Sequence, residues 1–260
     1  MIAARALGWY AALLACTTAC LGGVPLPASS APAPAPTTAD VVVVAVAVVV
    51  AVAVPDTIAQ RVQACTACHG KEGLATDQGY FPRIAGKPRV YLYNQLVGFR
   101  DGHRNNRTMY GLLANMSDAY LMEIAAYFAA LDLPYAPPTQ RLVPALELER
   151  GRKLAHAGDA AKRLPACTQC HGSTLTGVTP TVPALVGLSK AYLLAQLGAW
   201  RSGQRQAQQP DCMNEISRRL SIDDIAAVAS YLAQQPVPTD AKPAAQSTRP
   251  LPLNCGSIPP

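Results

Sequence analysis

The sequence has no block of basic residues. Its 22 lysines and arginines are interspersed with 16 aspartates and glutamates, and the formal net charge is +6. Nucleic-acid-binding proteins usually gather their basic residues in a patch or stripe. We therefore expect no nucleic-acid partner, although a mildly positive chain can be steered onto acidic proteins or an anionic membrane surface.

Long apolar runs are also scarce. The longest, residues 41–54, contains only valine and alanine, and it falls short of the ~20 apolar residues that a spanning helix needs. It follows a Pro/Ala-rich stretch, so residues 24–55 are interpreted as a linker with a possible membrane contact. Residues 1–23 combine one arginine, an apolar run and small residues, which is typical of an export signal. We expect a periplasmic protein, with membrane anchoring through a lipidated Cys16 as an alternative to simple cleavage.

Histidine is rare, and two of the four histidines end the same motif. Residues 65–69 read CTACH and residues 167–171 read CTQCH, each followed by glycine. On a helix, positions i and i+3 share a face and i+4 lies beside them. Two such thiols can add to the vinyl groups of one porphyrin, and the adjacent histidine can bind its iron. The motif predicts two covalently bound haem c groups, held by Cys65, Cys68, His69, Cys167, Cys170 and His171.

Other uses of paired cysteines fit less well. Zinc ribbons separate their cysteine pairs by about 15 to 20 residues, a much shorter gap than the one here. A thioredoxin-type dithiol needs a βαβ context, and the sequence shows no such pattern. Neither His103 nor His156 belongs to a motif, and both are expected to be exposed rather than ligands.

The two motifs belong to an internal duplication. Each is followed by a segment whose leucines and one aromatic residue form a helical stripe, and Gly102 or Gly203 is placed to end that helix. A further helix follows in each half, with Ser117 or Ser221 as its cap. Asp56 is placed to cap a helix that leads into the first motif. The residues that recur are Pro82, Gly86, Tyr91, Leu92, Gln95, Leu96, Arg100, Gly102 and Arg104, matched by Pro183, Gly187, Tyr192, Leu193, Gln196, Leu197, Arg201, Gly203 and Arg205.

The repeat also selects the second iron ligand of each half. Met109 lies seven residues before Met116, which precedes the capping Ser117, and Met213 lies seven residues before Leu220, which precedes Ser221. Met116 and Met122 have no methionine at the equivalent position of the other half. The pairing favours Met109 and Met213 as axial ligands, with ordinary core methionines as the alternative. His/Met ligation leaves no open position on the iron.

Two prolines and two cysteines complete the candidate residues. Pro82 follows His69 by 13 residues and Pro183 follows His171 by 12. The carbonyl of each proline could therefore accept a hydrogen bond from the ring nitrogen that does not bind iron. The spacing fits a plain turn proline equally well. Cys212 and Cys255 lie outside the motifs, and in an oxidising compartment we predict a disulfide between them.

The order of these motifs is similar to that of the diheme cytochromes c of the c4 type. Each unit has Cys-x-x-Cys-His-Gly, a Pro-x-x-x-Gly turn, a Tyr-Leu-x-x-Gln-Leu helix, an Arg-x-Gly-x-Arg end, a methionine and a final helix. The resemblance covers about residues 56–236. It implies an all-α fold of two tandem class I cytochrome c domains, 56–136 and 137–236, each a small helical bundle around one haem, with residues 237–260 as a Pro-rich tail.

The resemblance also implies a function. It favours Met109 and Met213 as ligands and Pro82 and Pro183 as partners of the histidines. It implies single-electron transfer in the periplasm, between a respiratory complex or dehydrogenase as donor and a terminal oxidase as acceptor, without catalysis. Two alternatives are a permanent cytochrome subunit of a membrane dehydrogenase or oxidase and, less favoured by the paired methionines, a peroxidase-like enzyme. Met116 departs from the family's leucine before the capping serine, and the N-terminal segments are additions.

Overall fold

The computed structural model describes residues 55–76, 80–138, 141–246 and 250–258. They belong to a compact unit that runs from Val52 to Pro260. The predicted signal and nearly all of the predicted linker lie outside the described residues. Within the described part the secondary structure is helical, with isolated β-bridges and no β-strand, as predicted. None of the helices in these ranges is long and apolar enough to cross a membrane.

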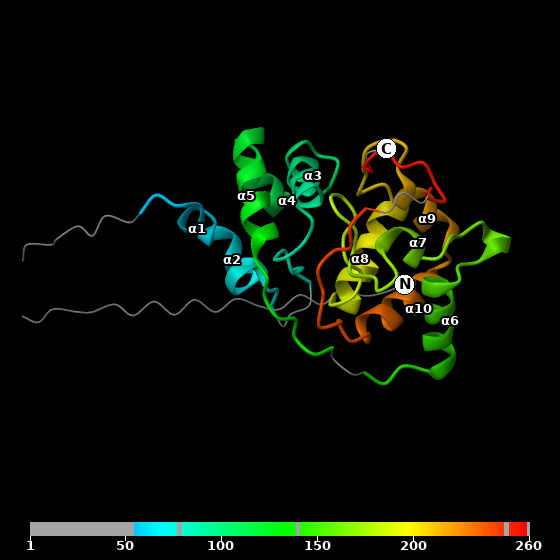
Figure 1. The fold of residues 1–260 in the computed structure, drawn as a ribbon. Coiled ribbons are helices and arrows are strands. Elements are labelled where there is room, and N and C mark those ends of the chain that lie inside the picture. The colour runs from blue at the N-terminus through cyan, green and yellow to red at the C-terminus, as the bar shows by residue number, and fades with distance from the viewer. Residues whose placement is uncertain (1–54, 77–79, 139–140, 247–249, 259–260) are drawn as a thin grey trace, which may run out of the picture. The chain divides into compact units, whose positions relative to one another are not determined.

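The helices form two successive groups, which Figure 1 shows as two clusters. Each group repeats the order of a motif helix, a long helix after the proline turn, a short methionine-bearing helix and a closing helix. The first group contains α1 (Ile58–Arg61), α2 (Gln63–His69), η1 (Lys71–Gly73), α3 (Arg89–Arg100), α4 (Arg107–Leu113) and α5 (Asp118–Ala130). The second contains α6 (Ala145–His156), η2 (Ala160–Lys162), α7 (Thr168–His171), α8 (Lys190–Arg201), α9 (Cys212–Arg219) and α10 (Ile222–Ala233).

The closing helices begin at the serines that the sequence predicts as caps. Ser117 accepts a hydrogen bond from the backbone N–H of Tyr120 at 3.3 Å, and Ser221 accepts one from Asp224 at 3.1 Å. The prediction for Asp56 is wrong by one residue, because Thr57 accepts the capping bond of α1. The Asp56 carboxylate instead pairs with Arg61.

Each half has its own hydrophobic core. In the first half the predicted face of α5 is buried and packs against α3. In the second half α10 packs against α8 through its own predicted face. The buried residues on these two faces are Leu121, Ile124, Ala125 and Phe128 in α5, and Ile225, Val228, Ala229 and Leu232 in α10. The helical stripes read from the sequence therefore identify both cores.

Helix α6 has no counterpart in the sequence analysis. It is mostly polar and buries only Gly151, Leu154 and Ala155, so its apolar face is narrow. It nevertheless packs closely against α10, because Gly151 has no side chain. A Cβ atom at this position would lie 2.2 Å from the backbone oxygen of Ala227.

The C-terminal tail contains no helix among its described residues, as predicted, but it is attached to the second half. The N–H of Thr179 donates to the carbonyl of Ala244 at 2.8 Å, and the N–H of Gly256 donates to the carbonyl of Pro210 at 3.0 Å. The first bond joins the tail to the segment between α7 and α8, and the second places its end beside the start of α9.

Candidate haem sites

Both Cys-x-x-Cys-His motifs lie at the C-terminal end of a short helix. Helix α2 ends at His69 and α7 ends at His171. The next residues, Gly70 and Gly172, have φ values of 76° and 85°, in the region that favours glycine over residues with a side chain. This conformation explains the glycine after each motif, because it turns the chain sharply once the histidine is placed.

Each histidine is held by the proline carbonyl that the sequence singled out. The Nδ1 atom of His69 lies 2.9 Å from the carbonyl oxygen of Pro82, and that of His171 lies 2.8 Å from that of Pro183. A carbonyl can only accept, so Nδ1 carries the proton and Nε2 keeps a free lone pair. Both prolines thus do more than form a turn: they fix the tautomer that an iron ligand needs.

The local environment keeps the two imidazoles neutral. Burial lowers the pKa of His69 and of His171, and this outweighs the carbonyl contacts, which raise it. Nearby positive groups, Arg104 for His69 and Lys87 for His171, lower the pKa further. A neutral imidazole is the form that binds a metal.

The motif cysteines are partly to fully buried thiols. Burial raises the pKa of Cys65 and Cys170, and it raises the pKa of Cys167 to about 11. Among the described residues no group of three or more histidine, cysteine or acidic side chains is placed to hold a metal ion. The arrangement therefore suits thioether attachment better than a zinc site.

The predicted axial methionines lie near the start of equivalent short helices. Met109 is in α4, where the side chain of Asn106 accepts a hydrogen bond from its backbone N–H at 3.0 Å. Met213 is the second residue of α9, whose N-cap is Asp211. Met109 packs against the same core as Cys65, and Met213 against the same core as Cys167. Met116 also contacts the first core, so packing alone does not separate it from Met109.

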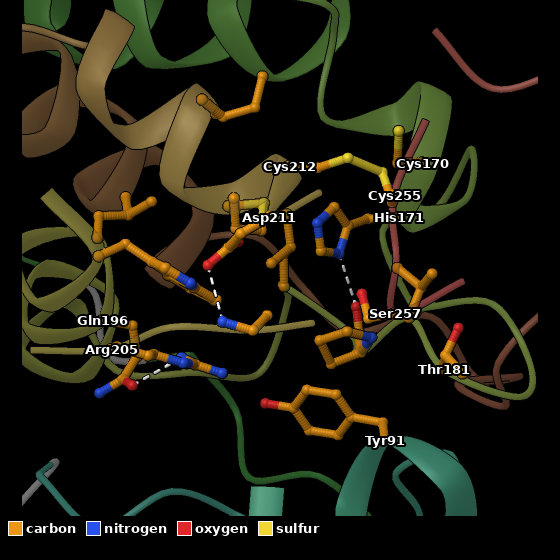
Figure 2. A pocket seen from close by; sticks show the side chains of 18 of the residues that line it. Tyr91, Cys170, His171, Thr181, Gln196, Arg205, Asp211, Cys212, Cys255 and Ser257 are labelled. Atoms are coloured by element: carbon orange, nitrogen blue, oxygen red, sulfur yellow. Dashed lines mark hydrogen bonds between the residues drawn. A yellow bond between two sulfur atoms is a disulfide. The ribbon is translucent and has the colours of Figure 1, made fainter. Parts of the chain in front are cut away.

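In the second half the predicted residues surround one cavity of about 510 Å³. Cys167, Cys170, His171, Pro183 and Met213 all line it. Figure 2 shows Cys170, His171 and the Cys212–Cys255 disulfide around this space, with Tyr91 of α3 approaching it from the first half. Much of the wall is leucine and valine, from Leu154, Leu193, Leu197, Val228 and Leu232.

The cavity wall also carries buried polar atoms that lack partners. Trp200 Nε1 and Thr181 Oγ1 are buried without a hydrogen-bond partner among the described residues, and both residues line the cavity. Such atoms are costly unless a ligand satisfies them. An apolar cavity with two attachment thiols, an imidazole, a thioether and unsatisfied donors fits a haem, whose flat body is apolar and whose edge carries carboxylates.

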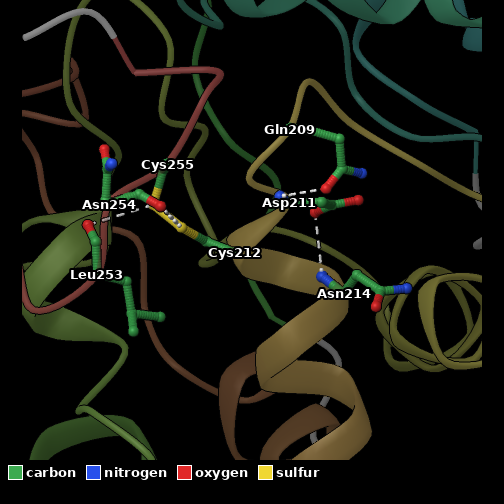
Figure 3. Close-up of a disulfide and its surroundings, with 7 residues drawn as sticks. All are labelled: Gln209, Asp211, Cys212, Asn214, Leu253, Asn254 and Cys255. Atoms are coloured by element: carbon green, nitrogen blue, oxygen red, sulfur yellow. Dashed lines mark hydrogen bonds between the residues drawn. A yellow bond between two sulfur atoms is a disulfide. The ribbon is translucent and has the colours of Figure 1, made fainter.

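The predicted disulfide is present. Cys212 and Cys255 are bonded, with their Cα atoms 5.4 Å apart. Cys212 is the first residue of α9 and directly precedes Met213, so the bond ties the C-terminal tail to the start of the methionine-bearing helix (Figure 3). The two residues also line the cavity.

Contacts between the halves were not predicted. Arg104 donates to Gln196 Oε1 at 2.6 Å, and its repeat partner Arg205 donates to Gln95 Oε1 at 2.7 Å. The recurrence of both residue types in the sequence indicates the duplication, but by itself it does not show that the two halves exchange these contacts. The exchange also brings Lys87 and Tyr91 of the first half to the cavity of the second.

Comparison with known proteins agrees with this geometry. A family model described as cytochrome c matches residues 148–236. The chain is 40% identical to the thiosulfate dehydrogenase electron acceptor of Thiomonas intermedia, over 67% of this chain and 79% of that protein. The solved cytochrome c4 of Pseudomonas stutzeri is 31% identical, with a TM-score of 0.56, and the match covers 67% of this chain and 94% of that one. The chain belongs to the cytochrome c4 family.

A third relative is a longer protein. The solved thiosulfate dehydrogenase (TsdBA) of Marichromatium purpuratum is 33% identical, with a TM-score of 0.58, over 66% of this chain. The match spans only 36% of that solved chain. Membership of the c4 family makes this protein a c4-type electron carrier rather than a catalyst, because the cytochromes c4 and the Thiomonas electron acceptor that it matches are electron-carrier cytochromes.

Proposed function

We propose that this protein is a periplasmic diheme carrier that accepts electrons one at a time from a thiosulfate dehydrogenase. The observation that carries the proposal is the cavity that gathers Cys167, Cys170, His171 and Met213, together with the repeated His–carbonyl contact in the first half. The names of the Thiomonas and Marichromatium relatives support the choice of donor. The acceptor is proposed to be a terminal oxidase or its electron donor.

The proposed roles follow the two halves of the repeat. Cys65 and Cys68 would attach one haem c, and Cys167 and Cys170 would attach the other, and each haem would supply reversible one-electron chemistry. His69 and Met109 would ligate the first iron, and His171 and Met213 the second, which would leave no position for a substrate. Pro82 and Pro183 orient the histidines, and the apolar walls exclude water.

The periplasm is proposed as the location on two grounds. The Cys212–Cys255 disulfide is the kind of bond that persists in oxidising compartments, and the first 23 residues have the features of an export signal. Whether Cys16 is lipidated is tested by metabolic labelling with a fatty acid. Labelling that disappears in Cys16→Ser would establish an anchor.

The proposed electron donor is tested by a reduction assay in solution. Oxidised protein is incubated without oxygen together with thiosulfate and a catalytic amount of a thiosulfate dehydrogenase, and haem reduction is followed in the visible spectrum. We expect full reduction only when both are present, with omission of either one as the control. A protein that dithionite reduces but this mixture does not would exclude thiosulfate dehydrogenase as the donor.

We propose a lasting complex with the donor as a second candidate, because the match to the Marichromatium thiosulfate dehydrogenase lies within a longer chain. Gentle extraction followed by size-exclusion chromatography distinguishes the two modes. Co-elution with a dehydrogenase subunit at high salt would indicate a permanent subunit, and elution as a lone chain would indicate a diffusing carrier.

A further inference from the structure

Lys87 is a buried amine that makes no hydrogen bond or ion pair with the residues that the structure describes. Its residue is 5% exposed, and it lies in the first half, directly before Pro88 at the start of α3. Nevertheless it lines the cavity of the second half. Among the described residues, no oxygen accepts a hydrogen bond from its ammonium group. Burial lowers the pKa of Lys87 to about 8, because the charged form is removed from water.

The surroundings of Lys87 do not supply the missing negative charge. The titratable groups that shift the pKa of Lys87 are Tyr192, which favours the charged amine, and Arg83, which opposes it. Arg205, also on the cavity wall, is 4% exposed and donates to the neutral amides of Gln95 and Gln196. A buried cation is expensive unless it is paired.

The acidic residues on the cavity wall are already engaged. Asp101 pairs with Arg100 at 2.8 Å. The two carboxylate oxygens of Asp211 accept the backbone N–H groups of Ala207 and Asn214. In the part of the chain that the structure describes, these are the acidic residues of the cavity lining. The site therefore has a surplus of buried positive charge.

We propose that Lys87 of the first half binds a carboxylate of the haem held by the second half. This inference rests on the proposed function, since it needs a haem in that cavity. A haem carries two carboxylate side chains on its edge, which is the chemistry that the unpaired ammonium lacks. The contact crosses from one half to the other, so the first half completes the site of the second.

The contact is one-sided. At the repeat position of Lys87 the second half has Leu188, which is buried in its own core. A cation at Lys87 therefore acts on one haem and has no counterpart for the other. A fixed positive charge near an iron favours the ferrous over the ferric state, so Lys87 raises the reduction potential of the second haem.

The test uses the holoprotein with Lys87→Gln, and both haem potentials are measured by spectroelectrochemical titration at pH 6. We expect one of the two reduction potentials to fall by about 59 mV, which corresponds to a tenfold change in the ferric–ferrous equilibrium of a one-electron couple. Lys87→Arg is expected to restore it. Lys153→Gln, an exposed lysine of α6 that does not line the cavity, removes the same charge and should change neither potential.

The affected haem is identified with Met213→His, which lowers the potential of the second haem by exchanging its axial methionine. If Lys87→Gln does not yield folded protein, Lys87→Met keeps the length of the side chain without its charge and gives the same readout. Unchanged potentials, or equal shifts of both, would overturn the inference. A protein without two closed haems would instead refute the proposed function, so the two failures can be told apart.

Discussion

At the scale of single residues, each site depends on which nitrogen of a histidine holds the proton. The carbonyl of Pro82 or Pro183 accepts from Nδ1, which leaves Nε2 for the iron. The spacing of these prolines in the sequence fits an ordinary turn as well as a hydrogen-bond partner of the histidine. The observed distances show that each carbonyl is such a partner. The axial methionines rest on the repeat, because Met116 also packs against the first core.

Substituting the methionines tests their proposed roles. In Met109→Ala or Met213→Ala one iron loses its sixth ligand, and we expect carbon monoxide to shift about half of the reduced haem signal. Met116→Ala and Met122→Ala are the matched controls and should leave the spectrum unchanged by carbon monoxide. If Met116→Ala opens a haem and Met109→Ala does not, the ligand assignment of the first half is wrong.

At the scale of helices, the structure depends on how α10 starts and on what packs against it. The Asp224 carboxylate is 1% exposed and pairs with Arg150 and Lys162, both at 2.6 Å, while it completes the cap at Ser221. Burial alone would raise the pKa of Asp224, but the bonds from Lys162, the Ser221 backbone and Arg150 outweigh it and hold the pKa well below its usual range. The first half has Tyr120 at this position, so only the second half depends on this carboxylate.

Asp224→Asn leaves Arg150 and Lys162 without their carboxylate, but both side chains are partly exposed to water, so we expect the free energy of unfolding to fall by about 1–3 kcal/mol. Asp223→Asn, at an exposed neighbouring position, should change it by less than about 0.5 kcal/mol. Because the pKa is lower in the folded state, the stabilisation is present above about pH 4 and is lost as the pH falls below that value. Thermal unfolding from pH 7 to pH 3 measures this, and equal acid sensitivity of wild type and variant would contradict it.

The contact of α6 with α10 gives another prediction. In Gly151→Ala the new methyl group would meet the Ala227 carbonyl, and we expect a loss of about 1–3 kcal/mol in unfolding free energy. Gly198→Ala, within α8 and with no atom inside 4 Å of its Cβ position, should be neutral or stabilising by about 0.5–1 kcal/mol. Chemical denaturation compares them, and a neutral Gly151→Ala would show that the helices can separate at no cost.

At the scale of the whole molecule, the disulfide and the exchange of arginines join segments distant in sequence. Cys212 and Cys255 are separated by 43 positions. By loop entropy, breaking this bond should cost about 4 kcal/mol of stability. The double variant with Cys212→Ser and Cys255→Ser should therefore melt at a lower temperature than the wild type, and its melting temperature should not change when a reductant is added. An unchanged melting temperature would mean that the tail contributes little.

Much of this organisation was predictable from the sequence because it is local or repeated. The haem motifs, the apolar stripes of α5 and α10 and the serine caps each follow from short spacings. Helix α6 was missed because it is polar and buries little. The role of Lys87 could not be found by comparing the halves, since its repeat partner is Leu188 and its cavity belongs to the other half. Contacts of that kind are set by how the two halves pack together.

The most direct test of the central proposal is the visible spectrum of the reduced holoprotein with and without carbon monoxide. Two haems that are both closed by histidine and methionine predict a c-type spectrum that carbon monoxide leaves unchanged. Such a result fits a carrier that needs no substrate position on either iron. A shift of about half of the signal in the unmodified protein would contradict the proposal, because one iron would then be open to a reacting molecule.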